Sequence, residues 1–243
     1  MAEILRTEWF DINNEDKDKL CNWLHEVFFP YLQTKNGVNW VAHYDIVSHP
    51  ETPYIEGAPL KKEVKNPSIP SGKENVVLTS ANTPSVFFGP NNALEAIEKE
   101  HMLYLSMRIN YRYAVFIEEE MINGPELHNQ PLGTGGAPAM QFGSYNVDSM
   151  QDEIELAQWY RGERFPRLPV TRGMIRGRKF LSISGWAKHG VLWEFAEMDE
   201  NEYSFENRFV EADRGENWRG RHVLEYVTHA PGSPHAGRRI WPK

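Results

Sequence analysis

The chain carries one sequence pattern twice, and this repeat constrains the fold more than any other feature. Residues Asn22–Leu32 read NWLHEVFFPYL, and residues Gln158–Leu168 read QWYRGERFPRL. One constant spacing matches Trp23 with Trp159, Phe29 with Phe165, Pro30 with Pro166, Leu32 with Leu168 and Gly37 with Gly173. The period exceeds a hundred residues, which is too long for a solenoid repeat. We therefore expect two copies of one small domain.

Composition indicates a soluble globular protein. The 243 residues suffice for two small cores, and 40% hydrophobic with 25% charged residues is an ordinary balance. No apolar run could span a bilayer, and the first residues lack the pattern of a secretory signal. The single Cys21 excludes an internal disulfide and a multi-cysteine metal site. We expect a cytoplasmic protein with no membrane partner, and the net charge of −8 argues against a nucleic-acid partner.

The first copy, residues 1–122, alternates strand-like and helical segments. Apolar residues three and four apart predict a helix over Leu20–Phe28, capped by Asn13 or Asn14 and ended by Pro30. Segments rich in β-forming residues predict strands at Ile4–Ile12, Val38–Val47, Asn75–Thr79, Ser85–Phe88 and Arg112–Glu120, with a second helix near Asn92–His101. The Pro-rich stretch His49–Lys73 reads as an irregular excursion.

The second copy, residues 139–243 with a C-terminal tail, follows a linker at Asn123–Pro138 that is rich in Gly and Pro. Its predicted strands are Met140–Val147, Arg178–Ser184, Val191–Ala196 and His222–Thr228, with helices near Gln151–Tyr160 and Glu200–Val210. Both copies thus read β-α-β-β-α-β, the ferredoxin-like unit. A sheet with both helices on one face leaves the other face uncovered. We predict an α+β fold in which two antiparallel sheets pack into a barrel, closed within one chain or between chains, and a homodimer.

The second copy also resembles a known group of proteins. AQWYRGERFPRLPVTRGMIRGRKFLSI, followed by VLWEFAEMDENEYSFENRF, is similar to the ethyl tert-butyl ether degradation (EthD) type of domain in the dimeric α+β barrel superfamily. Members of that family usually have a His near the end of the first helix, where the second copy has Arg161 and the first has His25. The superfamily includes monooxygenases, isomerases, lyases and haem enzymes, so the resemblance does not choose a reaction.

Four residues are candidates for catalysis. His25 and His43 are candidates for proton transfer, because imidazole titrates near neutral pH. His222 and Tyr226 lie four apart, so a strand would place both on one face as an acid–base and phenol pair. Each of these residues could equally be an ordinary structural or exposed position.

A second set of residues is expected to bind substrate. The second copy gathers basic residues, of which Arg161, Arg164, Arg176 and Lys179 could hold a planar anion. Trp40 and Tyr44 would form apolar walls, and Glu118 and Glu194 are carboxylates on strands that could face the barrel lumen. The lumen is the expected pocket, although polar residues on such strands commonly face water.

These residues favour a cofactor-independent lyase or isomerase that acts on an aromatic carboxylate or phenol. A His would move the proton that accompanies decarboxylation, C–C cleavage or isomerisation. A cofactor-free monooxygenase on an aromatic substrate and a non-enzymatic ligand-binding or scaffold protein are the alternatives. No metal and no cofactor are expected, with haem left open because chains of two such copies include haem proteins.

Overall fold

The computed structural model describes residues 2–47, 62–89, 93–94, 99–130, 135–198, 223 and 225–243. Most of the Pro-rich excursion, the predicted helix Glu200–Val210 and His222 lie outside these residues. In the part that is described, no helix is long and apolar enough to cross a membrane.

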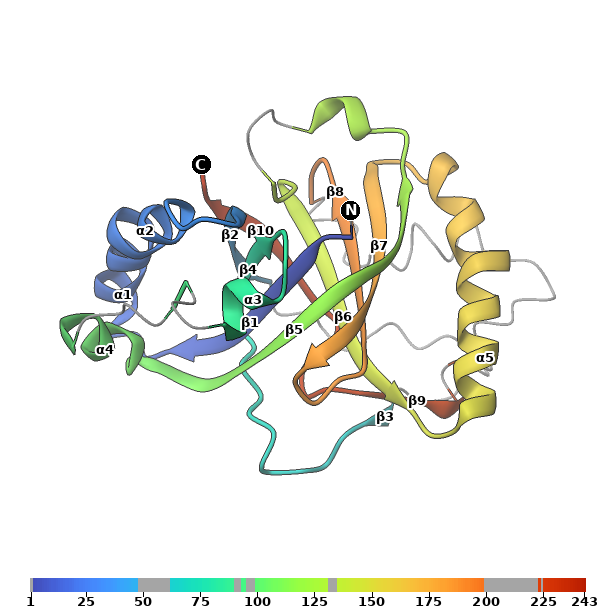
Figure 1. Ribbon diagram of the computed structural model, residues 1–243, viewed down its shortest axis with the longest axis horizontal. Coiled ribbons are helices and arrows are strands. Elements are labelled where there is room, and N and C mark those ends of the chain that lie inside the picture. The colour runs from blue at the N-terminus through green and yellow to red at the C-terminus, as the bar shows by residue number, and fades with distance from the viewer. Residues whose placement is uncertain are drawn as a thin grey trace.

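Strands dominate the fold, and helices flank them on two sides (Figure 1). The first half contains β1 (Ile4–Ile12), α1 (Lys17–Trp23), the π-helix η1 (Leu24–Phe28), α2 (Phe29–Gln33), β2 (Val38–Ile46), β3 (Lys62–Glu63), β4 (Asn75–Ala81), α3 (Ser85–Phe88), α4 (Lys99–Leu105) and β5 (Arg108–Asn123). The second half contains the 3₁₀ helix η2 (Leu127–Asn129), β6 (Ala139–Val147), α5 (Met150–Trp159), the π-helix η3 (Tyr160–Arg164), the 3₁₀ helix η4 (Phe165–Val170), β7 (Met174–Ser184), β8 (His189–Phe195), β9 (Val227–His229) and β10 (His235–Trp241).

Eight antiparallel strands close into a barrel. The first half contributes the order β2-β4-β1-β5, and the second half contributes β7-β8-β6-β10, the same arrangement of first, second, third and fourth strands. β5 pairs with β7, and β10 pairs with β2, so the ring closes within one chain. The short strands β9 and β3 pair beside β6 at the rim. The predicted fold class, ferredoxin-like units packed into an α+β barrel, is confirmed.

Alternation along the strands sends one set of side chains into the lumen and the other toward the helices. The lumen holds apolar residues from seven strands, among them Leu5, Trp9, Phe116, Phe142 and Phe180, all fully buried. An eight-stranded barrel is just wide enough for side chains to fill it, and the middle of this one is filled. The lumen is therefore a packed core rather than the open pocket that we expected.

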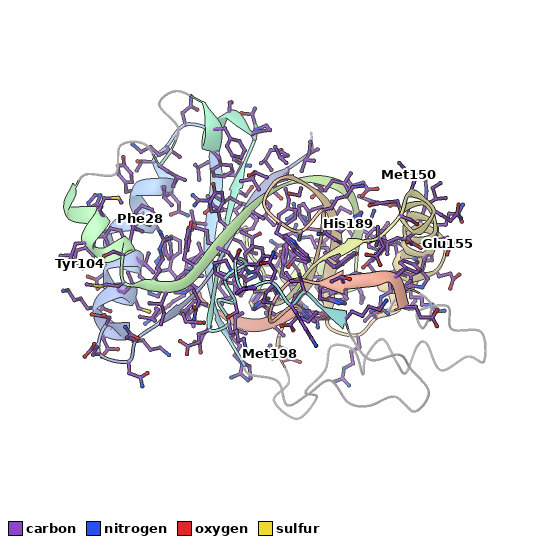
Figure 2. The ribbon with its side chains drawn as sticks, turned by 90° about the horizontal axis from the view of Figure 1, so that it is seen from below. Phe28, Tyr104, Met150, Glu155, His189 and Met198 are labelled. Carbon is purple, nitrogen blue, oxygen red and sulfur yellow. The ribbon has the colours of Figure 1, made fainter. Side chains whose placement is uncertain are left out.

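The two helical layers cover opposite sides of the barrel. Figure 2 shows Phe28 and Tyr104 on one side and Met150 and Glu155 of α5 on the other. On the first side, Trp23 of α1 stacks between Phe28 and Tyr104, with ring centroids 5.0 and 4.9 Å away. The helices thus pack through aromatic rings, which accounts for part of the aromatic content.

Residues matched in the sequence repeat occupy equivalent positions in the two halves. In each half, the first helix continues into a π-helix, η1 or η3. A buried phenylalanine, Phe29 or Phe165, follows the π-helix and begins the Phe-Pro pair. Gly37 and Gly173 both precede the second strand of their half with positive φ, +88° and +76°, a conformation that glycine adopts without strain. Pro30 does not end the helix, because it lies in the first turn of α2, where its missing N–H is tolerated.

Other local predictions are wrong, or fall partly outside the described residues. The first helix begins after Asp16 with no side-chain cap, rather than at Asn13 or Asn14. Ser85–Phe88 forms the short helix α3. The predicted helix Asn92–His101 overlaps α4 (Lys99–Leu105) at its end, while residues 92 and 95–98 lie outside the described residues. Tyr226 is helical rather than part of a strand, and the last barrel strand is β10, which lies in the predicted C-terminal tail.

Candidate functional site

Two predicted catalytic residues meet between the first helical layer and the sheet. His25 lies on the π-helix η1, and His43 lies on the helix-facing side of β2. Their Nε2 and Nδ1 atoms are 2.9 Å apart, and Nε2 of His43 is 3.0 Å from Oδ1 of Asn75 on β4. Single-turn π-helices are frequent at functional sites, which makes this position notable. The three side chains form a continuous hydrogen-bonded chain, here called the His25 relay.

Asn75 fixes the tautomers of both rings. Its Nδ2 faces the backbone oxygen of Phe10 at 3.5 Å, so its Oδ1 accepts a hydrogen bond from Nε2 of His43. Nδ1 of His43 is then an acceptor, and Nε2 of His25 donates to it. In neutral His25 the unprotonated nitrogen is consequently Nδ1, which can accept a proton while the relay stays intact.

Burial keeps both imidazoles neutral. His43 is completely buried, and burial together with the nearby His25 lowers its pKa to about 3. Half-burial, followed by the charge of Lys243, also lowers the pKa of His25, although Glu26 opposes the shift. At neutral pH the outer member of the relay is thus a free base, flanked by the rings of Phe29 and Trp241 at 5.8 and 6.4 Å.

The buried neutral His43 should make the fold sensitive to acid. Its pKa is about 3 in the folded protein and about 6.5 in the unfolded chain, so below pH 6.5 the unfolded chain binds a proton that the folded protein does not. Stability is therefore lost as the pH falls, by about 1.4 kcal/mol per pH unit for this group. Urea unfolding between pH 7 and 4.5 should show a smaller decline in His43→Gln than in wild type. His128→Gln, at a surface position, is the control, and equal declines in all three proteins would contradict the prediction.

Sequence reasoning missed a second buried network on the same face of the sheet. One carboxylate oxygen of Glu8, Oε1, is 2.8 Å from both Nη1 of Arg108 and Oη of Tyr111, and 3.2 Å from Nη2 of Arg6. Burial alone would raise the pKa of Glu8, but Arg6 and Arg108 lower it. Glu8 and His43 lie in one row across β1, β4 and β2, each paired with Val77. Two strand spacings, about 10 Å, therefore separate the network from the relay.

The predicted substrate-binding residues of the second helical layer do not meet the relay. Arg161 is exposed on η3, and Arg164 lies over the rings of Trp159 and Trp193 at 5.6 and 5.5 Å. Lys179 is buried, with Nζ 2.5 Å from Oε2 of Glu119. Tyr226 packs against the hydrophobic cluster that contains Trp193, and burial raises the pKa of Tyr226 to about 12. These four residues all belong to the second half of the chain, and their substrate-binding and catalytic roles stay predictions.

The other predicted substrate-binding residues gather at one end of the lumen. Trp40, Tyr44, Glu118, Arg176 and Glu194 come from β2, β5, β7 and β8 and all point inward. Nε of Arg176 donates to Oε2 of Glu194 at 2.5 Å, and Oη of Tyr44 donates to the backbone oxygen of Ala137 at 3.0 Å. The structure thus brings the five together, although each already has a partner within the protein.

Arg178 joins this cluster, which we call the glutamate end of the barrel. Its guanidinium bonds Oε2 of Glu118, with Nε at 2.8 Å, and also bonds Glu3, while Nη1 lies 3.9 Å from Oε2 of Glu194. Burial and the nearby Glu194 raise the pKa of Glu118, against the effect of Arg176. Gly135 covers the cluster so closely that a Cβ there would lie 1.7 Å from the Trp40 ring. Packing and paired charge both indicate a structural cluster.

Haem would need a buried imidazole with a free nitrogen and space for a large ring. Both nitrogens of His43 are bonded within the relay. His189 faces the second helical layer, but its ring stacks on Tyr145 at 5.5 Å and its Nε2 lies 2.9 Å from Oε2 of Glu153. Tyr160 and Trp193 fill the neighbouring core. The third buried imidazole of the described residues, that of His235, has its Nε2 3.1 Å from the backbone oxygen of Gly72 and its ring 6.1 Å from the Trp9 ring in the packed lumen. None of the three therefore combines an open nitrogen with the space that haem needs as an axial ligand.

Comparison with known proteins supports the fold alone. No protein-family model matches the chain, and no curated protein matches it. The resemblance of the second half to an EthD-type domain therefore stays a prediction.

Solved structures do match over nearly the whole chain. A chlorite dismutase candidate, TA0507, superposes with a TM-score of 0.57 and 9% identity, covering 99% of this chain and 95% of that one. An anthrone oxidase-like protein gives 0.57 and 10%, covering 98% and 91%, and a monooxygenase candidate, FN1347 from Fusobacterium nucleatum, gives 0.56 and 6%, covering 98% and 93%. The class that these similarities define is the barrel of two ferredoxin-like units. Identities this low carry no statement about activity.

Proposed function

We propose that the chain is a cofactor-independent enzyme of small-molecule catabolism, in which His25 removes a proton from an aromatic carboxylate or phenol. The observation that carries the proposal is the His25 relay, a partly exposed imidazole hydrogen-bonded to a buried imidazole whose tautomer Asn75 fixes. A lowered pKa keeps Nδ1 of His25 free to accept a proton at neutral pH.

Groups near His25 suit an anionic aromatic substrate. The Trp241 ring lies nearly parallel to the imidazole, at an interplanar angle of 25°, and offers an apolar face. The charge of Lys243 acts on His25 and would attract a carboxylate or phenolate. When Nδ1 takes a proton, Nε2–H still donates to His43, so the imidazolium keeps its neutral partner.

Two reaction classes share this first step. In a lyase, the phenolate takes the proton back from the His25 imidazolium at the carbon that bears the carboxylate, and the C–C bond then breaks to release CO₂ while its electron pair restores the aromatic phenolate. In an isomerase, the anion takes the proton back at another atom. In a monooxygenase, the carbanion adds O₂ to form a peroxide of the substrate. The O–O bond then breaks, which leaves one oxygen atom in the product as a carbonyl and releases the other as water. The descriptions of the anthrone oxidase-like protein and the monooxygenase candidate favour including this second class. Oxygen consumption distinguishes the two.

A deuterium-exchange screen tests the proposal. We expect the protein to exchange an acidic C–H of one compound for C–D in D₂O, or to convert that compound, in a panel of hydroxylated aromatic acids, phenols and anthrones. NMR would follow exchange and product, and an oxygen electrode would follow O₂ uptake. Saturable binding of a panel compound with neither exchange nor conversion would contradict the proposal and favour a ligand-binding protein.

A further inference from the structure

Among the residues that the structure describes, Arg112 has no acidic side chain as a partner. Its side chain points into the lumen at the end opposite the glutamate end, and its guanidinium lies over the Trp9 ring, 3.8 Å from the centroid. Four other arginines of the described chain, Arg6, Arg108, Arg176 and Arg178, each have a carboxylate oxygen within 3.2 Å. No carboxylate of the described residues lies within 4.0 Å of Arg112. Its guanidinium makes one long contact of 3.4 Å, from Nη2 to the backbone oxygen of Pro231.

Unsatisfied polar atoms cluster around this guanidinium. Nε of Arg112, Nε1 of Trp9 and Oγ1 of Thr7 are all buried, and among the described residues none of the three has a hydrogen-bond partner. Trp9 pairs with Arg112 across β1 and β5, and Thr7 pairs with Ala114, so the three side chains occupy one small patch of the lumen wall. Buried polar atoms nearly always have partners, so three open hydrogen-bonding atoms in one patch suit a ligand that accepts hydrogen bonds.

Ser144 faces the same end from β6, and its buried Oγ also lacks a partner in the part of the chain that is described. This end of the lumen is therefore lined by hydrogen-bonding groups, namely two hydroxyls, an indole N–H and a guanidinium. The glutamate end, by contrast, is lined by carboxylates. Burial lowers the pKa of Arg112 to about 9, and the distant charge of Glu63 only partly offsets this. Burying this unpaired charge costs folding free energy, and a bound anion would offset that cost.

We propose that Arg112, Trp9 and Thr7 form a binding site for an oxyanion, the carboxylate or phosphate group of a small molecule. The guanidinium offers Nε–H and the Nη groups to two oxygens of one planar or tetrahedral anion, and its stacking on Trp9 fixes the orientation of the fork. The indole N–H and the hydroxyls supply further donors. Arg112 keeps partial contact with solvent, so a small anion has a way in. The site lies inside the barrel and is separate from the His25 relay on the outer face of the sheet.

Anion titrations test the site. Inorganic phosphate and sodium benzoate are titrated separately into the full chain at constant ionic strength set with NaCl. We expect a saturable rise in the melting temperature with at least one of them, and a loss of affinity of about tenfold or more in Arg112→Gln. Arg112→Lys keeps the charge but not the fork, and should bind with intermediate affinity. Lys188→Gln removes an exposed cation and should bind like wild type.

The outcomes separate the possibilities. A response to phosphate alone assigns a phosphate ligand, and a response to benzoate alone assigns a carboxylate. No saturable response, or an equal response in Arg112→Gln, would overturn the site. If Arg112→Gln does not fold, the same anion is titrated into ¹⁵N-labelled wild type. The site requires that the Nε–H resonance of Arg112 shifts with the same saturation as the melting temperature, and an unchanged resonance would overturn it.

Discussion

Replacing His25 by alanine should lower kcat/KM by about 10²–10⁴-fold for the compound found in the exchange screen, the usual contribution of a general base. The expected loss follows from Nδ1 of His25, the free base at the outer end of the relay. Initial rates at pH 7, followed by NMR or oxygen uptake, measure it. His128→Ala, far from the relay on η2, is the control and should keep the wild-type rate.

Dependence on pH gives an independent check of the same assignment. The pKa of His25 lies below its ordinary value of 6.5, so the base is lost only as the pH falls below that value. The acid limb of kcat/KM should accordingly have its midpoint below pH 6.5. An acid limb that persists unchanged in His25→Ala would assign the base to another group.

Asn75 should act as a positioning residue within this reaction. Asn75→Leu removes the acceptor that fixes the tautomer of His43, and we expect a lower kcat. Asn75→Asp keeps an acceptor and adds a charge that favours protonated His43. It should therefore retain more activity than Asn75→Leu, with an acid limb moved to higher pH. Equal losses in both variants would indicate that the residue matters only for packing.

The repeat made the architecture predictable, because the same residue types occupy equivalent positions in the first helix of each half. Trp23 and Trp159, with the Phe-Pro pairs that follow, mark the ends of two first helices. The π-helical turns that precede Phe29 and Phe165 leave no separate sequence signal. β10 was missed because its sequence, HAGRRIW, has two adjacent arginines and little apolar alternation. Its hydrogen bonds to β2 and β6, rather than its own propensity, form it.

The sequence predicts which residue types form the candidate site, but it does not predict which of these residues contact one another. His25 and His43 were chosen because imidazole transfers protons near neutral pH, and their contact follows from the packing of η1 on β2. Glu8 and Arg108 are a hundred positions apart, so no local pattern connects them. Trp9 and Arg112 meet only through the register of β1 and β5. Such pairs depend on strand register, which a single sequence does not reveal.

Replacing Arg178 by methionine should cost about 3–5 kcal/mol of unfolding free energy, the range measured when one member of a buried ion pair is removed. Arg178 is 2% exposed, and it neutralises Glu118 and Glu3, with Glu194 nearby. Methionine fills a similar volume but leaves these carboxylates facing one another inside the barrel. Urea unfolding at pH 7 measures the loss.

Two comparisons separate the charge from the packing. Lys188→Met removes a cation from an exposed pair with Glu153, where the lysine side chain is 55% exposed, and should cost no more than about 1 kcal/mol. Adding Glu118→Gln to Arg178→Met should restore part of the stability, because one unpaired charge disappears. The deficit of Arg178→Met should also shrink toward pH 5, since burial raises the pKa of Glu118 and the carboxyl takes up a proton more readily. A deficit that is independent of pH and unchanged in the double variant would mean that Arg178 contributes packing alone.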